Sequence, residues 1–148
     1  MSNEEFHASR VKLVKTQKQL SELLGTSLKS IQSFEQGWRK VPAHIERQML
    51  FLLALHKGRT KGARPCWDVQ GCPPERRRGC PAWEFNAGHL CWFINGTICE
   101  GRPRVSWGSK IKICRRCGVF RDNVGISGAR KTEGDRSANP ASRILKDV

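Results

Sequence analysis

The sequence has no long apolar run. The longest, MLFLLAL at residues 49–55, is seven residues, whereas a helix needs about 20 apolar residues to span a bilayer. The first ten residues, MSNEEFHASR, also lack the charged segment and apolar core of a secretory signal. We therefore expect a soluble, cytoplasmic protein.

Acidic residues are scarce. The chain has 13 Asp and Glu against 27 Lys and Arg, which gives a formal net charge of +14. Such an excess of positive charge favours a polyanionic partner, either nucleic acid or an acidic membrane surface. No Ser/His/Asp constellation or carboxylate pair stands out, so we do not expect an enzyme.

Cysteine is absent before residue 66, and seven cysteines follow. In a reducing compartment we do not expect these cysteines to form a disulfide framework, and an odd number of them cannot all pair within one chain. The composition divides the chain into an all-α part at residues 1–58, a basic linker interrupted by Gly and Pro at 59–65, a cysteine-rich part at 66–121 and a polar tail, expected to be disordered, at 122–148.

The stretch TQKQLSELLGTSLKSIQSFEQG, residues 16–37, has apolar residues three and four apart, with one break at GTS. Gly25 suits the left-handed residue after a first helix. Ser27 can cap a second helix, and Gly37 suits its end. The pattern predicts a helix, a tight turn and another helix.

This stretch resembles the Cro/repressor-type (XRE-type) helix-turn-helix. The family pattern is matched in register by Thr16, Gln17, Leu20, Gly25, Ser27, Ile31, Glu35, Gly37, Arg39 and Pro42. Ser21 and Thr26 replace the usual Ala and Val at nearly the same size. The resemblance implies a DNA-binding domain, here of about five helices.

The second helix, about residues 28–35, is expected to lie in the major groove. Lys29 can donate to guanine, Gln32 can pair with adenine, and Leu28 can meet a thymine methyl group. Serines near the start of this helix and the basic residues after it are expected to reach phosphates. The expected DNA contacts are Gln17, Ser27, Leu28, Lys29, Ser30, Gln32, Ser33, Arg39 and Lys40.

The segment PAHIERQMLFLLALHKG, residues 42–58, reads as a helix that is apolar nearly all round. Such a helix must be buried. We expect it to form the domain core and to make some contact with a second copy of the chain, because two-fold operators require a homodimer on double-stranded DNA.

The cysteines are candidate metal ligands, because a small segment rich in Gly and Pro buries too little apolar surface to fold unaided. CRRC, residues 114–117, has the spacing of a zinc knuckle or an iron–sulfur loop. The remaining ligands must converge through the fold. The candidates are Cys66, Cys72, Cys80, Cys91, Cys99, Cys114 and Cys117.

Residues 66–120 resemble the two-CW domain family, named for its repeated Cys-Trp pair. The matching pieces are CWDVQGC, CPAWE, GHLCWFINGTIC and KICRRCGVF. The resemblance implies a shared cysteine framework and a bacterial origin, and it does not name the metal.

Zinc and a [4Fe–4S] cluster both accept four thiolates. Scattered ligands and nearby tryptophans favour the cluster, whereas CRRC followed by Gly118 favours zinc. The cluster is slightly favoured because a redox-labile site gives a regulator a signal. The sequence therefore predicts an all-α helix-turn-helix domain followed by a small, irregular, metal-stabilised domain and a disordered tail.

The predicted function is a sequence-specific DNA-binding transcriptional regulator whose cysteine-rich domain senses metal or redox state. The alternative is a DNA-binding protein whose zinc-stabilised domain only docks a partner protein. A thiol oxidoreductase based on CRRC is disfavoured, because the βαβ context of such motifs is missing.

Overall fold

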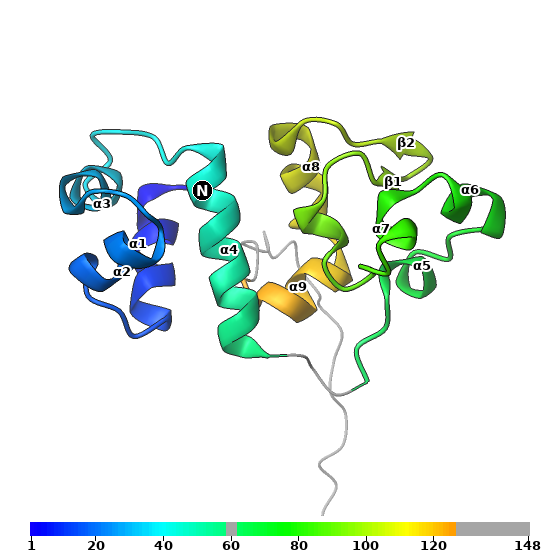
Figure 1. Ribbon diagram of the computed structural model, residues 1–148, viewed down its shortest axis with the longest axis horizontal. Helices are drawn as coiled ribbons and strands as arrows, with labels where there is room; N and C mark the ends of the chain where they lie inside the picture. Colours follow the sequence, from blue (N-terminus) through cyan, green and yellow to red (C-terminus); the bar gives the residue numbers. More distant parts are fainter. Residues whose placement is uncertain (59–61, 127–148) are drawn as a thin grey trace, which may run out of the picture.

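The computed structural model describes residues 1–58 and 62–126, and this part of the chain is mostly helical (Figure 1). Residues 1–58 form four helices, one fewer than the five or so expected. The helices are α1 (Asn3–Lys12), α2 (Gln17–Leu23), α3 (Leu28–Glu35) and α4 (Ala43–Lys57).

Local capping fixes the ends of the first three helices. The Ser2 hydroxyl accepts from the Glu5 amide at the start of α1. Thr16 and Gln19 form a reciprocal capping box at the start of α2, which satisfies amides that would otherwise lack partners. Ser27 caps α3 in the predicted way, accepting from the Ser30 amide at 3.1 Å.

The cysteine-rich part is built from short pieces. In chain order they are α5 (Cys66–Val69), α6 (Pro74–Arg78), α7 (Pro81–Glu84), the 3-10 helix η1 (Cys91–Phe93), β1 (Ile98–Cys99), β2 (Arg102–Pro103), α8 (Trp107–Cys114) and α9 (Gly118–Val124). The two strands pair antiparallel, with Ile98 opposite Pro103 and Cys99 opposite Arg102. Helix α9 continues to Val124 and so includes the first residues of the tail that was expected at 122–148. Residues 59–61 of the expected linker and 127–148 of the expected tail lie outside the described residues.

Helix α4 lies between the two halves of the molecule and packs against both (Figure 1). One hydrophobic core runs through them. From the first half it includes Phe6, Leu20, Ile31, Phe34, Met49 and Leu53, and from the second Trp92, Trp107, Ile111, Phe120 and Val124. The prediction that this helix belongs to the core is confirmed. Most of its apolar surface is covered within one chain, although Leu55 is 62% exposed.

A buried carboxylate joins the halves. Glu46 on α4 accepts hydrogen bonds from the Met1 amino group, the Trp107 indole and the Arg115 guanidinium, each at 3.0 Å. Arg115 also pairs with Glu5 on α1. Burial alone would raise the pKa of Glu46, but these donors and the positive charge of the amino group lower it below its usual value.

An arginine next in sequence to Glu46 strengthens the same junction. The Arg47 guanidinium lies 4.9 Å from the Phe93 ring centroid and 5.2 Å from that of Trp107, and it donates to the Phe93 carbonyl. Cation–π contacts of this kind favour a guanidinium held between rings.

Among the described residues, no helix has the length and apolar character needed to cross a membrane.

Candidate metal centre and candidate nucleic-acid interface

The seven cysteines, all within the described residues, are free thiols. They come from segments spread over 52 positions of sequence, yet each lines one or both of two adjoining cavities. The first cavity, of about 270 Å³, is lined by Cys66, Cys72, Cys80, Cys91 and Cys99. The second, of about 200 Å³, is lined by Cys66, Cys91, Cys99, Cys114 and Cys117.

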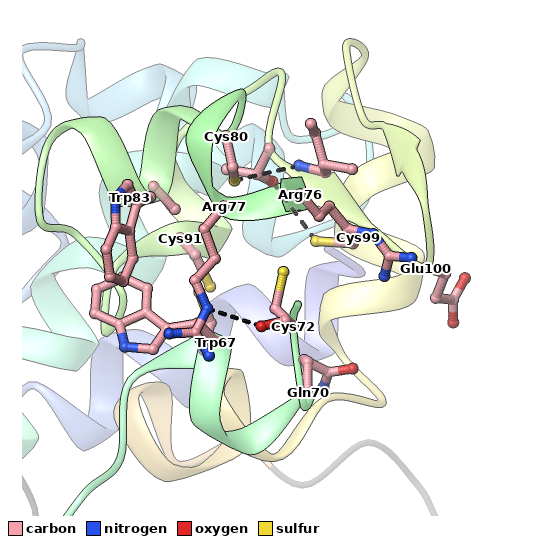
Figure 2. A pocket seen from close by; sticks show the side chains of 14 residues that line it. Trp67, Gln70, Cys72, Arg76, Arg77, Cys80, Trp83, Cys91, Cys99 and Glu100 are labelled. Atoms are coloured by element: carbon pink, nitrogen blue, oxygen red, sulfur yellow. Dashed lines mark hydrogen bonds between the residues drawn. The ribbon is translucent and has the colours of Figure 1, made fainter. Parts of the chain in front are cut away.

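The first cavity is enclosed by α5, α6, α7 and the β1 strand. Figure 2 shows the thiols of Cys72, Cys91 and Cys99 directed toward a common space. The Cys80 sulfur accepts a hydrogen bond from the Ile98 amide at 3.4 Å. Arg77 lies at the rim and donates to the Cys72 carbonyl at 2.7 Å, which fixes the short loop ahead of α6.

The thiols influence one another's ionisation. A hydrogen bond between the Cys66 and Cys91 side chains lowers the pKa of Cys66 and raises that of Cys91. Burial raises the pKa of Cys114 to about 11, and burial also raises that of Cys72. The ionisation of Cys66 is therefore linked to that of Cys91, whereas burial is the main influence on Cys72 and Cys114.

The buried cation Lys110 also influences these thiols. Lys110 on α8 is 1% exposed, and its ammonium donates to the Thr97 hydroxyl. Its charge helps to lower the pKa of Cys66 and opposes the rise at Cys114. A buried ammonium is costly without an anion nearby, and these thiols are the ionisable groups that it favours as anions.

The donor set fits a thiophilic metal in chemistry, because soft thiolates select zinc, Cu(I) and iron–sulfur clusters. Its spacing is wider than that of a closed site. Within residues 1–58 and 62–126, no three Cys, His, Asp or Glu side chains are grouped closely enough to hold one metal ion. Metal binding would therefore require the thiols around a cavity to come closer together.

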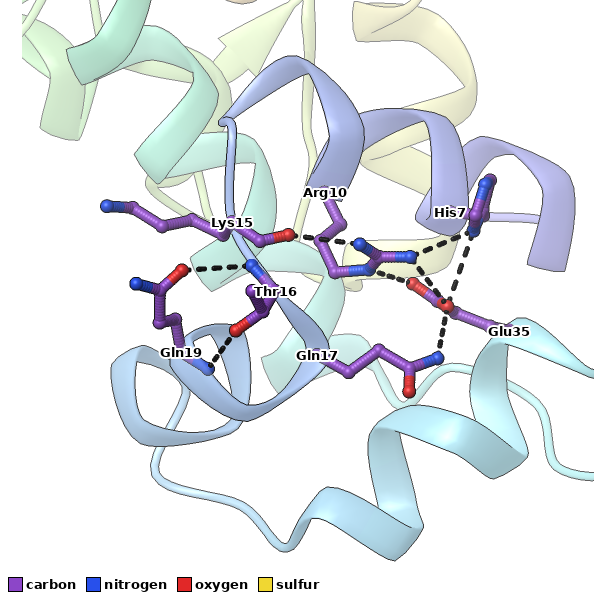
Figure 3. Close-up of polar contacts among 7 residues, drawn as sticks. All are labelled: His7, Arg10, Lys15, Thr16, Gln17, Gln19 and Glu35. Carbon is purple, nitrogen blue, oxygen red and sulfur yellow. Dashed lines mark hydrogen bonds and ion pairs between the residues drawn. The ribbon is translucent and has the colours of Figure 1, made fainter.

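The candidate nucleic-acid interface centres on α3, whose last residue is held by a cluster of donors (Figure 3). Glu35 accepts from Arg10 Nε at 2.5 Å and from Gln17 Nε2 at 2.7 Å. The His7 ring lies 3.3 Å from the same carboxylate. Arg10 also donates to the Lys15 carbonyl, so α1, α2 and α3 are fixed relative to one another.

Burial would raise the pKa of Glu35, but the hydrogen bonds from Arg10, Gln17 and His7 and the charge of Arg10 lower it overall. The carboxylate therefore stays ionised at neutral pH. Gln17 was expected to contact DNA, and here its side-chain amide donates to Glu35 at the end of the second helix.

The exposed side of α3 carries three of the expected contacts to bases. Lys29 and Gln32 are exposed, and Leu28 is 42% exposed. The expectation for Ser33 is wrong. Ser33 is only 8% exposed, and its hydroxyl donates to the Lys29 carbonyl at 2.8 Å. The chain turns back after α3, and the Arg39 amide donates to the Ser33 carbonyl.

The remaining expected DNA contacts flank α3. The Ser27 and Ser30 hydroxyls lie 2.9 Å apart at its start. Arg39 and Lys40 are exposed after its end, and the Arg39 guanidinium lies 5.6 Å from the Phe34 ring centroid. Trp38, beside them, is 75% exposed. The exposed positions on either side of α3 are thus mainly polar or basic.

The contacts of Arg115 with Glu5 and Glu46 were not predicted from the sequence. No role was predicted for Glu46 either. A lone Glu within the apolar stretch of residues 42–58 was the available signal, because a carboxylate on a buried helix needs a partner.

Comparison of the chain with protein-family models, with curated proteins and with solved structures finds no match.

Proposed function

We propose that this protein is a sequence-specific, DNA-binding transcriptional regulator whose cysteine-rich half binds a metal ion or an iron–sulfur cluster. The observation that carries the proposal is the exposed side of α3, which presents Lys29 and Gln32 while Glu35 ties the end of the helix to α1 and α2. The resemblance of residues 16–42 to the Cro/repressor-type helix-turn-helix supports the same assignment.

In this proposal, α3 enters the major groove with its first turns toward the bases. Lys29 donates to guanine acceptors and Gln32 pairs with adenine, while Leu28 contacts a thymine methyl group. Arg39 and Lys40 neutralise phosphates beside the groove. Because the Glu35 cluster holds the helix before DNA arrives, less ordering is needed on binding.

The cysteine-rich half is connected to this surface through α8. Cys114 is the last residue of α8 and lines the second thiol cavity. The next residue, Arg115, pairs with Glu5 on α1 and Glu46 on α4. A bound metal would supply a fixed ligand position at Cys114, and Arg115 would relay any change there to the helices that support α3.

Sequence-specific DNA binding can be tested by selecting, from a random pool of duplexes, those that the whole chain binds. We expect an enriched sequence motif, and we expect K29A/Q32A to lose preference at about two base positions, each worth about 1–3 kcal/mol. K112A removes an exposed lysine from α8 and is the charge-matched control, expected to keep the motif. No enrichment with the wild-type protein would refute the proposal.

Salt dependence provides a second measurement. If about six phosphates are neutralised, a plot of log affinity against log salt should have a slope near −5. An affinity that does not change with salt would show that the positive charge of the chain does not neutralise DNA phosphates.

The sensor role and the docking alternative differ in one measurable respect. A sensor must bind DNA with different affinity in its two states, whereas a zinc that only folds a docking domain predicts equal affinity at any redox poise. Gel shifts with metal-loaded, metal-depleted and oxidised protein would separate the two, because equal affinities across all three samples exclude sensing.

A further inference from the structure

Seven thiols are three more than one zinc ion or one [4Fe–4S] cluster accepts. Their distribution around the two cavities accounts for this number. Cys72 and Cys80 line the first cavity alone, and Cys114 and Cys117 line the second alone. The other three cysteines line both cavities; they are Cys66, Cys91 and Cys99.

Two tetrahedral ions need eight ligand positions, and one thiolate that bridges both ions reduces the number of cysteines to seven. We infer that the cysteines hold two divalent, zinc-class ions joined by one bridging thiolate. Cys72 and Cys80 bind one ion, and Cys114 and Cys117 bind the other. Among the three shared cysteines, one is the bridge and each ion takes one more. The inference rests on the proposed metal-binding role.

Cys91 is the bridge in this arrangement. It is the buried member of the shared group, at 7% exposure, and it lines both cavities. Cys66 and Cys99, which also line both cavities, complete the two coordination shells.

The surrounding charges suit such a centre. Seven thiolates and two divalent ions leave three negative charges. The first cavity is lined by Arg76 and Arg77, and the second by Arg116. Buried Lys110 donates to Thr97, which lines the first cavity. A buried anionic centre is costly unless cations lie close to it. Here arginines line both cavities, and Glu100, which also lines both, is paired with Arg104.

The experiment uses full-length protein purified without oxygen, with metal content measured by elemental analysis and native mass spectrometry. We expect two zinc ions per chain. C72S/C80S and C114S/C117S should each bind one ion less, and each is the matched control for the other. Loss of both ions from both variants would contradict two separate pairs of terminal ligands.

Cadmium-113 NMR of the wild-type protein gives a second readout that does not depend on a variant folding. Two resonances, each split by coupling to the other, are expected from a bridging thiolate. A single resonance, or one ion per chain with three thiols that react freely with Ellman's reagent, would overturn the inference and leave the proposed metal-binding role intact.

Two other outcomes also overturn the inference. Iron with acid-labile sulfide would identify a cluster, which is consistent with the proposed function. Absence of any metal would refute the metal half of that function as well. The duplex selection is independent of these measurements, so the DNA-binding half can stand or fail alone.

Discussion

At the scale of single residues, Glu35 ties the end of α3 to α1 and α2. Its carboxylate joins Arg10, Gln17 and His7. We expect E35Q, which keeps the size of the side chain, to lower the free energy of unfolding by about 1–3 kcal/mol, because the partly buried Arg10 loses its anion. Urea denaturation would measure this. E22Q, on the exposed face of α2, is the control, and equal effects of both variants would contradict the role of Glu35.

The lowered pKa values of Glu35 and Glu46 predict that the free energy of unfolding decreases at acid pH. A carboxyl group with a lower pKa in the folded state contributes stability above its ordinary value of 4.5. That contribution is lost as pH falls below this value and through the folded pKa. The urea midpoint should therefore fall between neutral pH and about pH 3, and E35Q should flatten the curve. An unchanged slope in E35Q would show that Glu35 does not contribute.

At the scale of secondary-structure elements, the turn between α2 and α3 depends on the left-handed conformation of Gly25, at φ +60°. G25A should cost about 1–2 kcal/mol, although there is open space around a Cβ atom there. G108A, on α8, also meets open space in an ordinary helical conformation, and should gain about 0.5–1 kcal/mol. Thermal unfolding of both variants would check the opposite signs. A stabilised G25A would rule out the conformational argument.

At the scale of the whole molecule, the shared core around α4 predicts that both halves unfold together. Four of the five tryptophans lie beyond residue 66, so fluorescence reports mainly on the cysteine-rich half, whereas far-ultraviolet circular dichroism reports on helices of both. The two signals should give one coincident transition in urea, as two-state unfolding requires. Separate midpoints would show that the halves are independent.

The parts of this architecture that could be predicted from sequence are those set by neighbouring residues. Gly25, Ser27 and Gly37 marked the helix ends because a positive φ or a capping hydroxyl acts within one turn of the chain. The cysteine content indicated a thiol site. Ser33 was misplaced because helical periodicity does not reveal where the chain returns after α3.

Long-range contacts carried no local signal. Glu46 meets Trp107 and Arg115 across 61 and 69 positions of sequence, and the cysteines converge from opposite ends of their segment. The division of the thiols between two cavities could not be predicted, because it depends on how α5 and α9 pack, and those contacts cross about 50 residues.

The central position of α4 has a consequence for how such a protein can be recombined. Proteins with two structural halves are often treated as interchangeable modules, in which one half is fused to a new partner. Here residues 1–58 would carry into any such chimera an uncovered apolar flank and a Glu46 without its partners Trp107 and Arg115. The two halves can therefore be exchanged only together with the surface that joins them.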